Sequence, residues 1–337
     1  MNIVVTGGLG NVGKSTVKAC LEEGHSVTIL EAPAACRSAQ SFLRRLYPSE
    51  RERTKIIYCD IRNYEDVKNA LDHLQGAGLP DAIIHLAALI PPASDRNSEV
   101  TWQINVGGTK NVIDANASLK KPARLVLASS IATYGDRLED FWIKTSDAFQ
   151  PSDIYSKTKI ESEKLVLGSG VPALVLRLSY VVSPEWLQFD PLMFHMPPKT
   201  RLEVVHTMDA GRAFAHAATK EALPETRVFD IGGGAACRTT FRAYLDRIFS
   251  YFGLGDSGFL PDCAFAQSGF HCGWYEDSDF ADSVLHFRSK SLEDYYREVQ
   301  CKTDKYVPWV RLVRPAAHRW VLRKSSFLPI PVTTGYS

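Results

Sequence analysis

The stretch Ile3-Val4-Val5-Thr6-Gly7-Gly8-Leu9-Gly10-Asn11-Val12-Gly13-Lys14-Ser15-Thr16 joins an apolar β-branched run to the start of a helical pattern through a glycine-rich loop. Gly7, Gly10 and Gly13 are spaced so that the backbone can approach a pyrophosphate at a helix N-terminus. The same residues also fit a Walker A loop, because Gly8 is followed by four residues and then by Gly13-Lys14-Ser15. This stretch alone therefore leaves two nucleotide-binding folds open.

The strands that follow favour the dinucleotide fold. A Walker A protein needs a later strand that ends in Asp to hold magnesium, whereas Ile83-Ile84-His85-Leu86 ends without an acid. A dinucleotide fold needs an acid for the adenosine ribose at the end of its second strand, where Glu31 stands. The Glu31 carboxylate would repel a 2′-phosphate, so we expect NAD, with NADP as the alternative if Arg37 reaches that phosphate.

The rest of the chain alternates short apolar runs with helical stretches, which predicts an open parallel sheet covered by helices on both faces. The expected strands are Ile3–Thr6, Ser26–Leu30, Ile56–Cys59, Ala82–Leu86, Leu125–Ala128, Ala173–Leu178 and Val228–Ile231. Beyond about Cys237, helical patterns are separated by Gly- and Pro-rich loops. We therefore predict a doubly wound α/β Rossmann domain over 1–236, to which a smaller, mostly helical substrate lobe over 237–337 is joined. Residues 181–202 are expected to contribute to that lobe.

Composition excludes several classes of protein. The 337 residues are about twice the usual size of one domain, so two lobes are expected. Lys and Arg number 39 against 38 Asp and Glu, which gives no reason to expect a nucleic-acid partner. There is no apolar run long enough for a membrane span. The seven cysteines form no CxxC pair and the chain enters a strand without a leader, so we expect a cytoplasmic protein with reduced thiols and no metal.

A Ser, a Tyr and a Lys are candidates for moving a proton. Tyr155 and Lys159 stand four residues apart in a helical stretch, so their side chains share one face. Ser130 closes an earlier strand at its carboxyl end, where an open α/β sheet binds its ligand. When a carbinol loses hydride to a nicotinamide, Tyr155 would take the hydroxyl proton and Ser130 would hold the oxygen. Lys159 would lower the pKa of Tyr155, which is about 10 in free tyrosine.

Three other features have plainer interpretations. Tyr64 and Lys68 repeat the Tyr-x-x-x-Lys spacing, but they open the helix after the third strand, so we assign Tyr64 to the surface or to packing. His85 ends a core strand and is expected to be a hydrogen-bonded structural histidine. The run Phe270-His271-Cys272-Gly273-Trp274-Tyr275 is assigned to packing, with the wall of a substrate pocket as the alternative.

Taken together, these motifs resemble the extended short-chain dehydrogenase/reductase family, also called the NAD-dependent epimerase/dehydratase family. The resemblance covers roughly residues 1–235. It includes the loop Thr6–Gly13, Asp60-Ile61, His85-Leu86-Ala87-Ala88, Asn105-Val106-Gly107-Gly108-Thr109, Ser129-Ser130, Tyr155 with Lys159, and Leu176-Arg177-Leu178. It implies cofactor contacts from Gly7, Gly10, Asn11, Val12, Gly13, Glu31, Asp60, Ile61, Leu86, Ala87, Ala88, Asn105, Tyr155 and Lys159.

The departures from the family pattern bear on the substrate. Sugar 4,6-dehydratases of the family carry an Asp-Glu pair where Ile131-Ala132 stand here. Nucleotide-sugar epimerases usually have an Asn at the position of Tyr180 and an Arg at that of Leu202. We therefore expect an NAD(P)-dependent oxidoreductase that acts on a secondary alcohol or ketone of a carbohydrate-like small molecule. The alternatives are an epimerase that retains its cofactor and a non-catalytic dinucleotide-binding protein.

The C-terminal tail combines apolar and basic residues. The apolar members recur at helical spacing and are Trp309, Leu312, Val313, Ala316 and Trp320. The basic members are Arg311, Arg314, Arg319, Arg323 and Lys324. Because Pro315 interrupts the pattern, we expect two short helices. We expect the tail to pack on its own lobe or against a second subunit of a homodimer, and we favour contact with an anionic membrane surface less.

Overall fold

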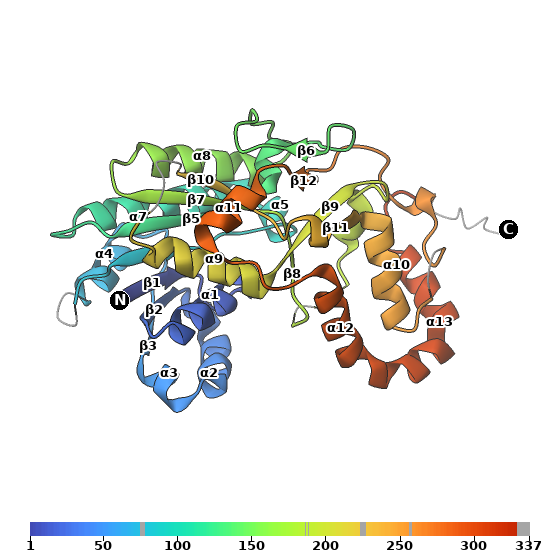
Figure 1. Cartoon of the computed structure of the whole chain (residues 1–337), viewed down its shortest axis with the longest axis horizontal. Coiled ribbons are helices and arrows are strands. Elements are labelled where there is room, and N and C mark those ends of the chain that lie inside the picture. The colour runs from blue at the N-terminus through green and yellow to red at the C-terminus, as the bar shows by residue number, and fades with distance from the viewer. Residues whose placement is uncertain (75–77, 186, 188, 223–226, 256–257, 329–337) are drawn as a thin grey trace, which may run out of the picture.

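The computed structural model describes residues 1–328 apart from 75–77, 186, 188, 223–226 and 256–257. All seven predicted strands pair in one parallel sheet of order β10-β7-β5-β4-β1-β2-β3 (Figure 1). They are β1 (Asn2–Thr6), β2 (Ser26–Glu31), β3 (Thr54–Tyr58), β4 (Ala82–His85), β5 (Arg124–Ser130), β7 (Ala173–Leu178) and β10 (Val228–Ile231). The strand order changes direction between β1 and β4, and in such sheets ligands bind at the carboxyl ends beside that point.

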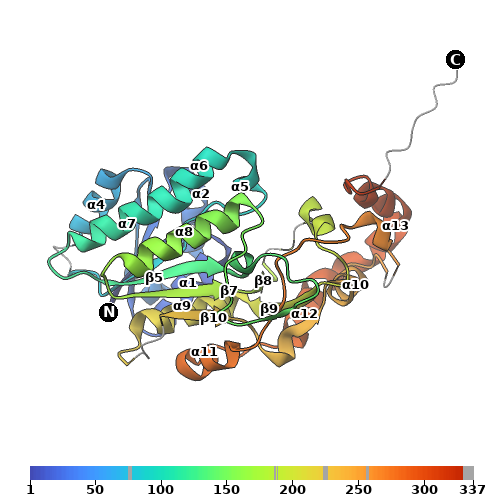
Figure 2. The same ribbon diagram turned by 90° about the horizontal axis from the view of Figure 1, so that it is seen from above.

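Helices cover both faces of the sheet, which confirms the predicted doubly wound architecture (Figure 2). The face that carries α1 (Asn11–Glu22) is also covered by α2 (Cys36–Arg45), α9 (Thr207–Thr219) and α11 (Ser278–Leu285). The other face is covered by α4 (Tyr64–Asp72), α7 (Gly108–Ala117) and α8 (Ile154–Gly168). The short helices are α3 (Pro48–Glu52), α5 (Ala93–Arg96) and α6 (Ser98–Trp102).

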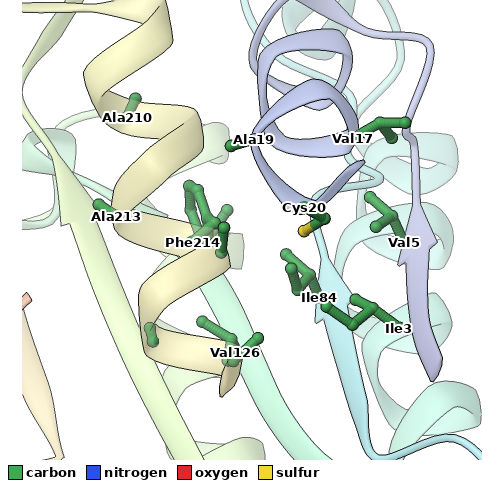
Figure 3. Packing of buried hydrophobic residues seen from close by; sticks show 14 of the residues in the cluster. Ile3, Val5, Val17, Ala19, Cys20, Ile84, Val126, Ala210, Ala213 and Phe214 are labelled. Atoms are coloured by element: carbon green, nitrogen blue, oxygen red, sulfur yellow. The ribbon is translucent and has the colours of Figure 1, made fainter. Parts of the chain in front are cut away.

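The core of the sheet domain forms because the strands are apolar on both faces. Phe214 of α9 is fully buried, and Figure 3 shows its ring between the helix that carries Ala19 and Cys20 and the strands that carry Ile84 and Val126. Burying a side chain of this size contributes about 1.5–3 kcal/mol, so this contact holds α9 against α1 and the sheet.

A second core lies beyond the carboxyl ends of the strands, in a smaller lobe. Its three-stranded sheet has the order β11-β9-β8 and is built from β8 (Tyr180–Val182), β9 (Arg201–His206) and β11 (Arg238–Thr240). Its helices are α10 (Phe241–Tyr251), α12 (Leu292–Thr303) and α13 (Val307–Leu322). The pair β6 (Trp142–Ile143) and β12 (Trp274–Tyr275) joins the loop after β5 to this region.

The tail differs from its prediction in two respects. First, α13 continues through Pro315 as one helix. Pro315 and Arg311 are both exposed, so water can solvate the Arg311 carbonyl that loses its amide partner. Second, the apolar stripe faces outward, since Trp309 is 72% and Leu312 is 76% exposed. Apart from Trp320, whose ring contacts Phe189 at 5.1 Å between centroids, the expectation that these side chains pack on their own lobe was therefore wrong, and packing against a second subunit stays a prediction.

Candidate active site

The glycine-rich loop connects β1 to α1 beside the β1–β4 switch point. Gly7 has a positive φ of 68°, and a Cβ there would lie 2.8 Å from the Ala87 backbone. A Cβ on Gly13 would lie 2.2 Å from the Gly7 carbonyl oxygen. The N-cap residue of α1, Gly10, supplies no side-chain cap, and the first turn contains no acid. The first N–H groups of α1, including those of Asn11 and Val12, therefore suit an anionic group such as a diphosphate.

The loop after β4 lies directly against the glycine loop. The Leu86 N–H donates to the Thr6 carbonyl at 3.2 Å, and the Ala87 N–H donates to Thr6 Oγ1 at 3.2 Å. The predicted segment Leu86-Ala87-Ala88 is thereby brought beside Gly7 at the switch point. His85 lies just behind, and its two ring nitrogens bond Thr6 Oγ1 at 2.7 Å and Thr109 Oγ1 at 3.0 Å. The prediction of a structural, hydrogen-bonded histidine is confirmed.

The two predicted adenosine-side acids end neighbouring strands. The Glu31 carboxylate at the end of β2 accepts a bond from the Leu9 N–H at 3.1 Å, which places it beside the glycine loop. The Cys59 N–H bonds the Glu31 carbonyl at 2.9 Å, so Asp60 lies next along this edge. The Arg62 guanidinium beside Asp60 holds the pKa of that carboxyl below its usual range. Ile61 is buried and packs on α7 through Gly108.

Asn105 differs from the other predicted cofactor residues, because its side chain is buried and bonded within the protein. It is 2% exposed, and its amide oxygen accepts the Leu89 N–H at 2.8 Å. Its amide nitrogen donates to the Leu89 carbonyl and to Thr158 Oγ1, both at 3.0 Å. Both amide donors are thus used within the protein. Asn105 fixes the loop after β4 to α8, which makes it a positioning residue in this structure.

The predicted proton-transfer trio comes together at the carboxyl edge of the sheet. Ser130 ends β5 and lies close enough to Tyr155 of α8 for its hydroxyl to act on the pKa of that phenol. Lys159, one turn further along α8, lies with its ammonium 5.7 Å from the centre of the Tyr155 ring. The Lys159 ammonium also donates to the Ala128 carbonyl at 2.8 Å. Asp153 caps α8 by accepting the Ser156 N–H at 2.6 Å, so Tyr155 opens the helix and faces the strand end.

Burial is the dominant electrostatic effect on this trio. It raises the pKa of Tyr155 to about 12, although the Ser130 hydroxyl acts in the opposite direction. It also lowers the pKa of Lys159 to about 8, against the opposing charge of Glu163. Ser130 and Lys159 alone therefore do not lower the pKa of Tyr155 below its ordinary value, in contrast to the expectation from the sequence. Proton transfer through Tyr155 would need further positive charge beside it, which an oxidised nicotinamide carries.

A network of buried polar side chains lies behind the trio, and the sequence-based prediction assigned it no function. Glu163, one turn after Lys159, forms an ion pair with Arg177 of β7 at 2.8 Å, and both side chains are at most 5% exposed. Glu163 also accepts a bond from the Ser129 hydroxyl, next to Ser130. Arg177 in turn donates to the Tyr134 hydroxyl at 2.6 Å. The network connects α8 to β5 and β7. In the sequence it is indicated only by polar residues that interrupt apolar stretches.

The substrate lobe contributes further residues to this edge. Ser130 pairs with Leu178, so Tyr180 emerges two residues beyond the strand end on the same side. His271 Nδ1 lies 3.9 Å from the carboxylate of Asp153, two residues before Tyr155. The Tyr180 ring contacts that of Tyr244, 6.0 Å between centroids, in the aromatic core of the lobe. In the Phe270–Tyr275 run, Cys272 and Tyr275 are buried and Phe270 packs on the core of the smaller lobe, so the assignment of this run to packing is confirmed.

The chain is similar in sequence to known enzymes that are named for different classes of substrate. The chain is 31% identical over 202 residues to a 3-beta-hydroxysteroid dehydrogenase of Mycolicibacterium neoaurum, covering 57% of this chain and 50% of that protein. It is 29% identical over 211 residues to the human decarboxylating sterol-4-alpha-carboxylate 3-dehydrogenase, covering 60% and 50%. It is 27% identical over 167 residues to a UDP-glucose 4-epimerase of Yersinia pestis, covering 49% and 47%. The chain thus spans about half the length of the curated relatives it matches.

Solved structures and a family model extend the comparison. A dTDP-glucose 4,6-dehydratase of Bacillus anthracis in complex with NAD superposes with a TM-score of 0.72 at 18% identity, covering 92% of this chain and 98% of that one. This likeness supports the fold. The model of the NAD-dependent epimerase/dehydratase family matches residues 3–217 and so spans the glycine loop, Ser130, Tyr155 and Lys159. The predicted cofactor, NAD, is the one that this family's description states. The chain belongs to the NAD-dependent epimerase/dehydratase family.

Proposed function

We propose that this protein is an NAD-dependent oxidoreductase that acts on a secondary alcohol or the corresponding ketone, with Tyr155 as the general base. The observation that carries the proposal is the position of the Lys159 ammonium, which is held by the Ala128 carbonyl at 2.8 Å and lies 5.7 Å from the centre of the Tyr155 ring, beside Ser130 at the carboxyl edge of the sheet. The glycine loop and Glu31 stand at the same edge. An acid–base group beside a dinucleotide cradle suits hydride transfer coupled to proton transfer.

The roles follow from the positions of the side chains. NAD supplies the acceptor for the hydride that leaves the carbinol carbon. Tyr155 Oη takes the proton from the alcohol hydroxyl as the carbonyl forms, and Ser130 Oγ donates to the same oxygen. Lys159 is held by the Ala128 carbonyl with its charge toward the Tyr155 ring, where it favours the phenolate. Its pKa of about 8 leaves it charged at neutral pH.

The substrate that we favour is apolar, in place of the carbohydrate-like molecule expected from the family pattern. Tyr180 contacts Tyr244, and the buried Leu202 lies in the same apolar core, at positions where nucleotide-sugar enzymes of the family usually carry Asn and Arg. Neither of these two side chains carries a charge that could bind a diphosphate. Two of the relatives described above are named for steroid or sterol substrates. A ring-bearing, hydrophobic secondary alcohol is consistent with both observations.

The proposal is tested by substituting Tyr155. Tyr155→Phe removes the proton acceptor and keeps the ring, so turnover of a 3β-hydroxysteroid with NAD should fall by about 10²–10⁴-fold, as measured by NADH absorbance. The thermal shift produced by NAD should remain, because the cradle is unchanged. Tyr64→Phe is the matched control, since Tyr64 packs on the sheet through α4. Near-normal turnover in Tyr155→Phe would contradict the assignment of the base.

A further inference from the structure

Helix α13 has a packed side and an exposed side. On the packed side, Val321 is 4% exposed in the core of the substrate lobe, and His318 lies against Phe259, with 5.2 Å between ring centroids. The side chain of Arg314 covers Gly255. Just after the helix, the Ser325 hydroxyl donates to the Ala264 carbonyl at 2.5 Å. The helix is therefore anchored on this side, whereas among the described residues the other side has one aromatic contact, between Trp320 and Phe189, with 5.1 Å between ring centroids.

The exposed side is apolar and aromatic. Positions 309, 312, 313, 316 and 320 share one face of a helix with 3.6 residues per turn, opposite His318. The exposed fractions of the four large side chains on it are 72% for Trp309, 76% for Leu312, 54% for Val313 and 53% for Trp320. Monomeric proteins rarely expose such a continuous apolar stripe unless something covers it. We call this stripe the outer face of α13.

The charges around the outer face have one sign. Residues 305–324 contain six Lys and Arg and no Asp or Glu, so the rest of the chain has a formal net charge of −5. Among the residues that the structure describes, no carboxylate forms an ion pair with any of these six. Arg319 and Arg323 flank the apolar stripe and are exposed, and Lys324 lies over the Trp320 ring at 5.6 Å. The free cations thus surround an apolar, Trp-bearing surface.

We propose that the outer face of α13 docks on the surface of an anionic lipid bilayer. An interfacial helix places Trp and Leu at the boundary of headgroups and acyl chains, while its Lys and Arg contact anionic headgroups. The structure places α13 at the end of the molecule that is furthest from β1, β2 and β3 (Figures 1 and 2). No described helix is long and apolar enough to cross a membrane, so the contact is with the surface.

A second copy of the chain fits this face less well than lipid does. In a two-fold dimer the same patch would meet itself, which would oppose the free cations of one copy to those of the other. No carboxylate within residues 305–324 offsets that repulsion. An anionic bilayer satisfies both the charge and the apolar stripe, which is why we choose it as the occupant.

The test is co-sedimentation of the full chain with vesicles. With phosphatidylcholine and phosphatidylserine at roughly three to one, we expect at least ten-fold tighter binding than with phosphatidylcholine alone, and weaker binding at higher salt. Trp309→Ser with Leu312→Ser should reduce that binding at least ten-fold, and so should Arg319→Glu with Arg323→Glu. Circular dichroism verifies that the variants fold, as expected for exposed positions.

A control variant and the contrary outcomes distinguish an anionic lipid surface from a second copy of the chain as the partner of the outer face. Lys120→Glu with Lys121→Glu alters two exposed lysines just beyond α7 and should leave most of the binding. Equal binding to both vesicle compositions, or none to either, would overturn the proposal. A concentration-dependent increase in mass that the Trp309→Ser, Leu312→Ser variant abolishes would identify a second copy as the occupant, and would overturn it as well. Dehydrogenase activity is not a readout here, so failure of the proposed function would leave this result intact.

Discussion

At the scale of single residues, His85 shows how the interior determines a protonation state. Both of its ring nitrogens bond threonine hydroxyls, and the imidazole is 2% exposed. Burial first, and then the nearby Lys159 ammonium, lower its pKa to about 3, from 6.5 in free histidine. The unfolded chain therefore binds a proton between pH 6.5 and 3 that the folded chain does not bind.

This depressed pKa predicts how stability depends on pH. The folded state should lose stability as pH falls from about 6.5 toward 3, and the His85 contribution between pH 7 and 5 is about 2 kcal/mol. His85→Gln should lower the free energy of unfolding at pH 7. Between pH 7 and 5, however, the free energy of unfolding of this variant, measured by urea denaturation, should change by about 2 kcal/mol less than that of the wild type. His73→Gln, at an exposed position of the chain, is the control and should keep the wild-type slope. Equal slopes in His85→Gln and wild type would show that His85 titrates normally.

At the scale of elements, α8 is held in place by a buried ion pair behind the face that carries Tyr155 and Lys159. Glu163 is fixed by Arg177 of β7 and by Ser129 of β5, so the helix that carries Tyr155 and Lys159 is connected to two strands. Removing one partner of a buried ion pair is costly, because the other charge is left without compensation.

Substitutions in this pair should therefore be strongly non-additive. Arg177→Leu should lower the free energy of unfolding by about 3–5 kcal/mol, since it leaves the Glu163 carboxylate buried and unpaired. Adding Glu163→Gln to that variant should recover part of the loss, because neither position of the pair then holds an unpaired charge. Chemical denaturation of the single and double variants measures both effects. If the loss in the double variant equalled the sum of the two single losses, the two residues would act independently.

The elements also show where prediction from sequence succeeds. The central strands β1, β4, β5 and β7 are buried on both faces, and such strands produce continuous apolar runs that can be recognised without a structure. The positions of Ser130, Tyr155 and Lys159 follow from helical spacing and strand ends. The direction in which α13 faces could not be predicted, because an apolar stripe is the same in sequence whether it is buried or exposed. The role of Glu163 depends on Arg177, fourteen residues away on another element, and spacing does not reveal such a contact.

At the scale of the whole molecule, the two lobes are joined by a buried carboxylate. Asp209 of α9 is fully buried and accepts bonds from the Ser289 N–H at 3.0 Å, the Ser289 hydroxyl at 2.8 Å and the Lys290 N–H at 3.0 Å. Close by, His206 at the end of β9 bonds Glu298 of α12 at 3.1 Å. The start of the α12 segment is thus attached to the helix that packs on α1.

This attachment predicts that the two lobes unfold together and that NAD stabilises both. A ligand at one hundred times its Kd adds about 2.7 kcal/mol to every part of a cooperative unit, so NAD should slow hydrogen exchange in α10 and α12 as well as in the sheet. Asp209→Ala leaves three donors of the 289–290 segment without their acceptor, at about 1–3 kcal/mol each for those that stay buried. In that variant, exchange in α10 and α12 should be faster and should no longer respond to NAD, whereas β1 and β4 remain protected. Asp304→Ala, at an exposed position, should behave as wild type. If exchange in α12 of the wild-type chain were indifferent to NAD, the lobes would be independent, and Asp209 would serve only local packing.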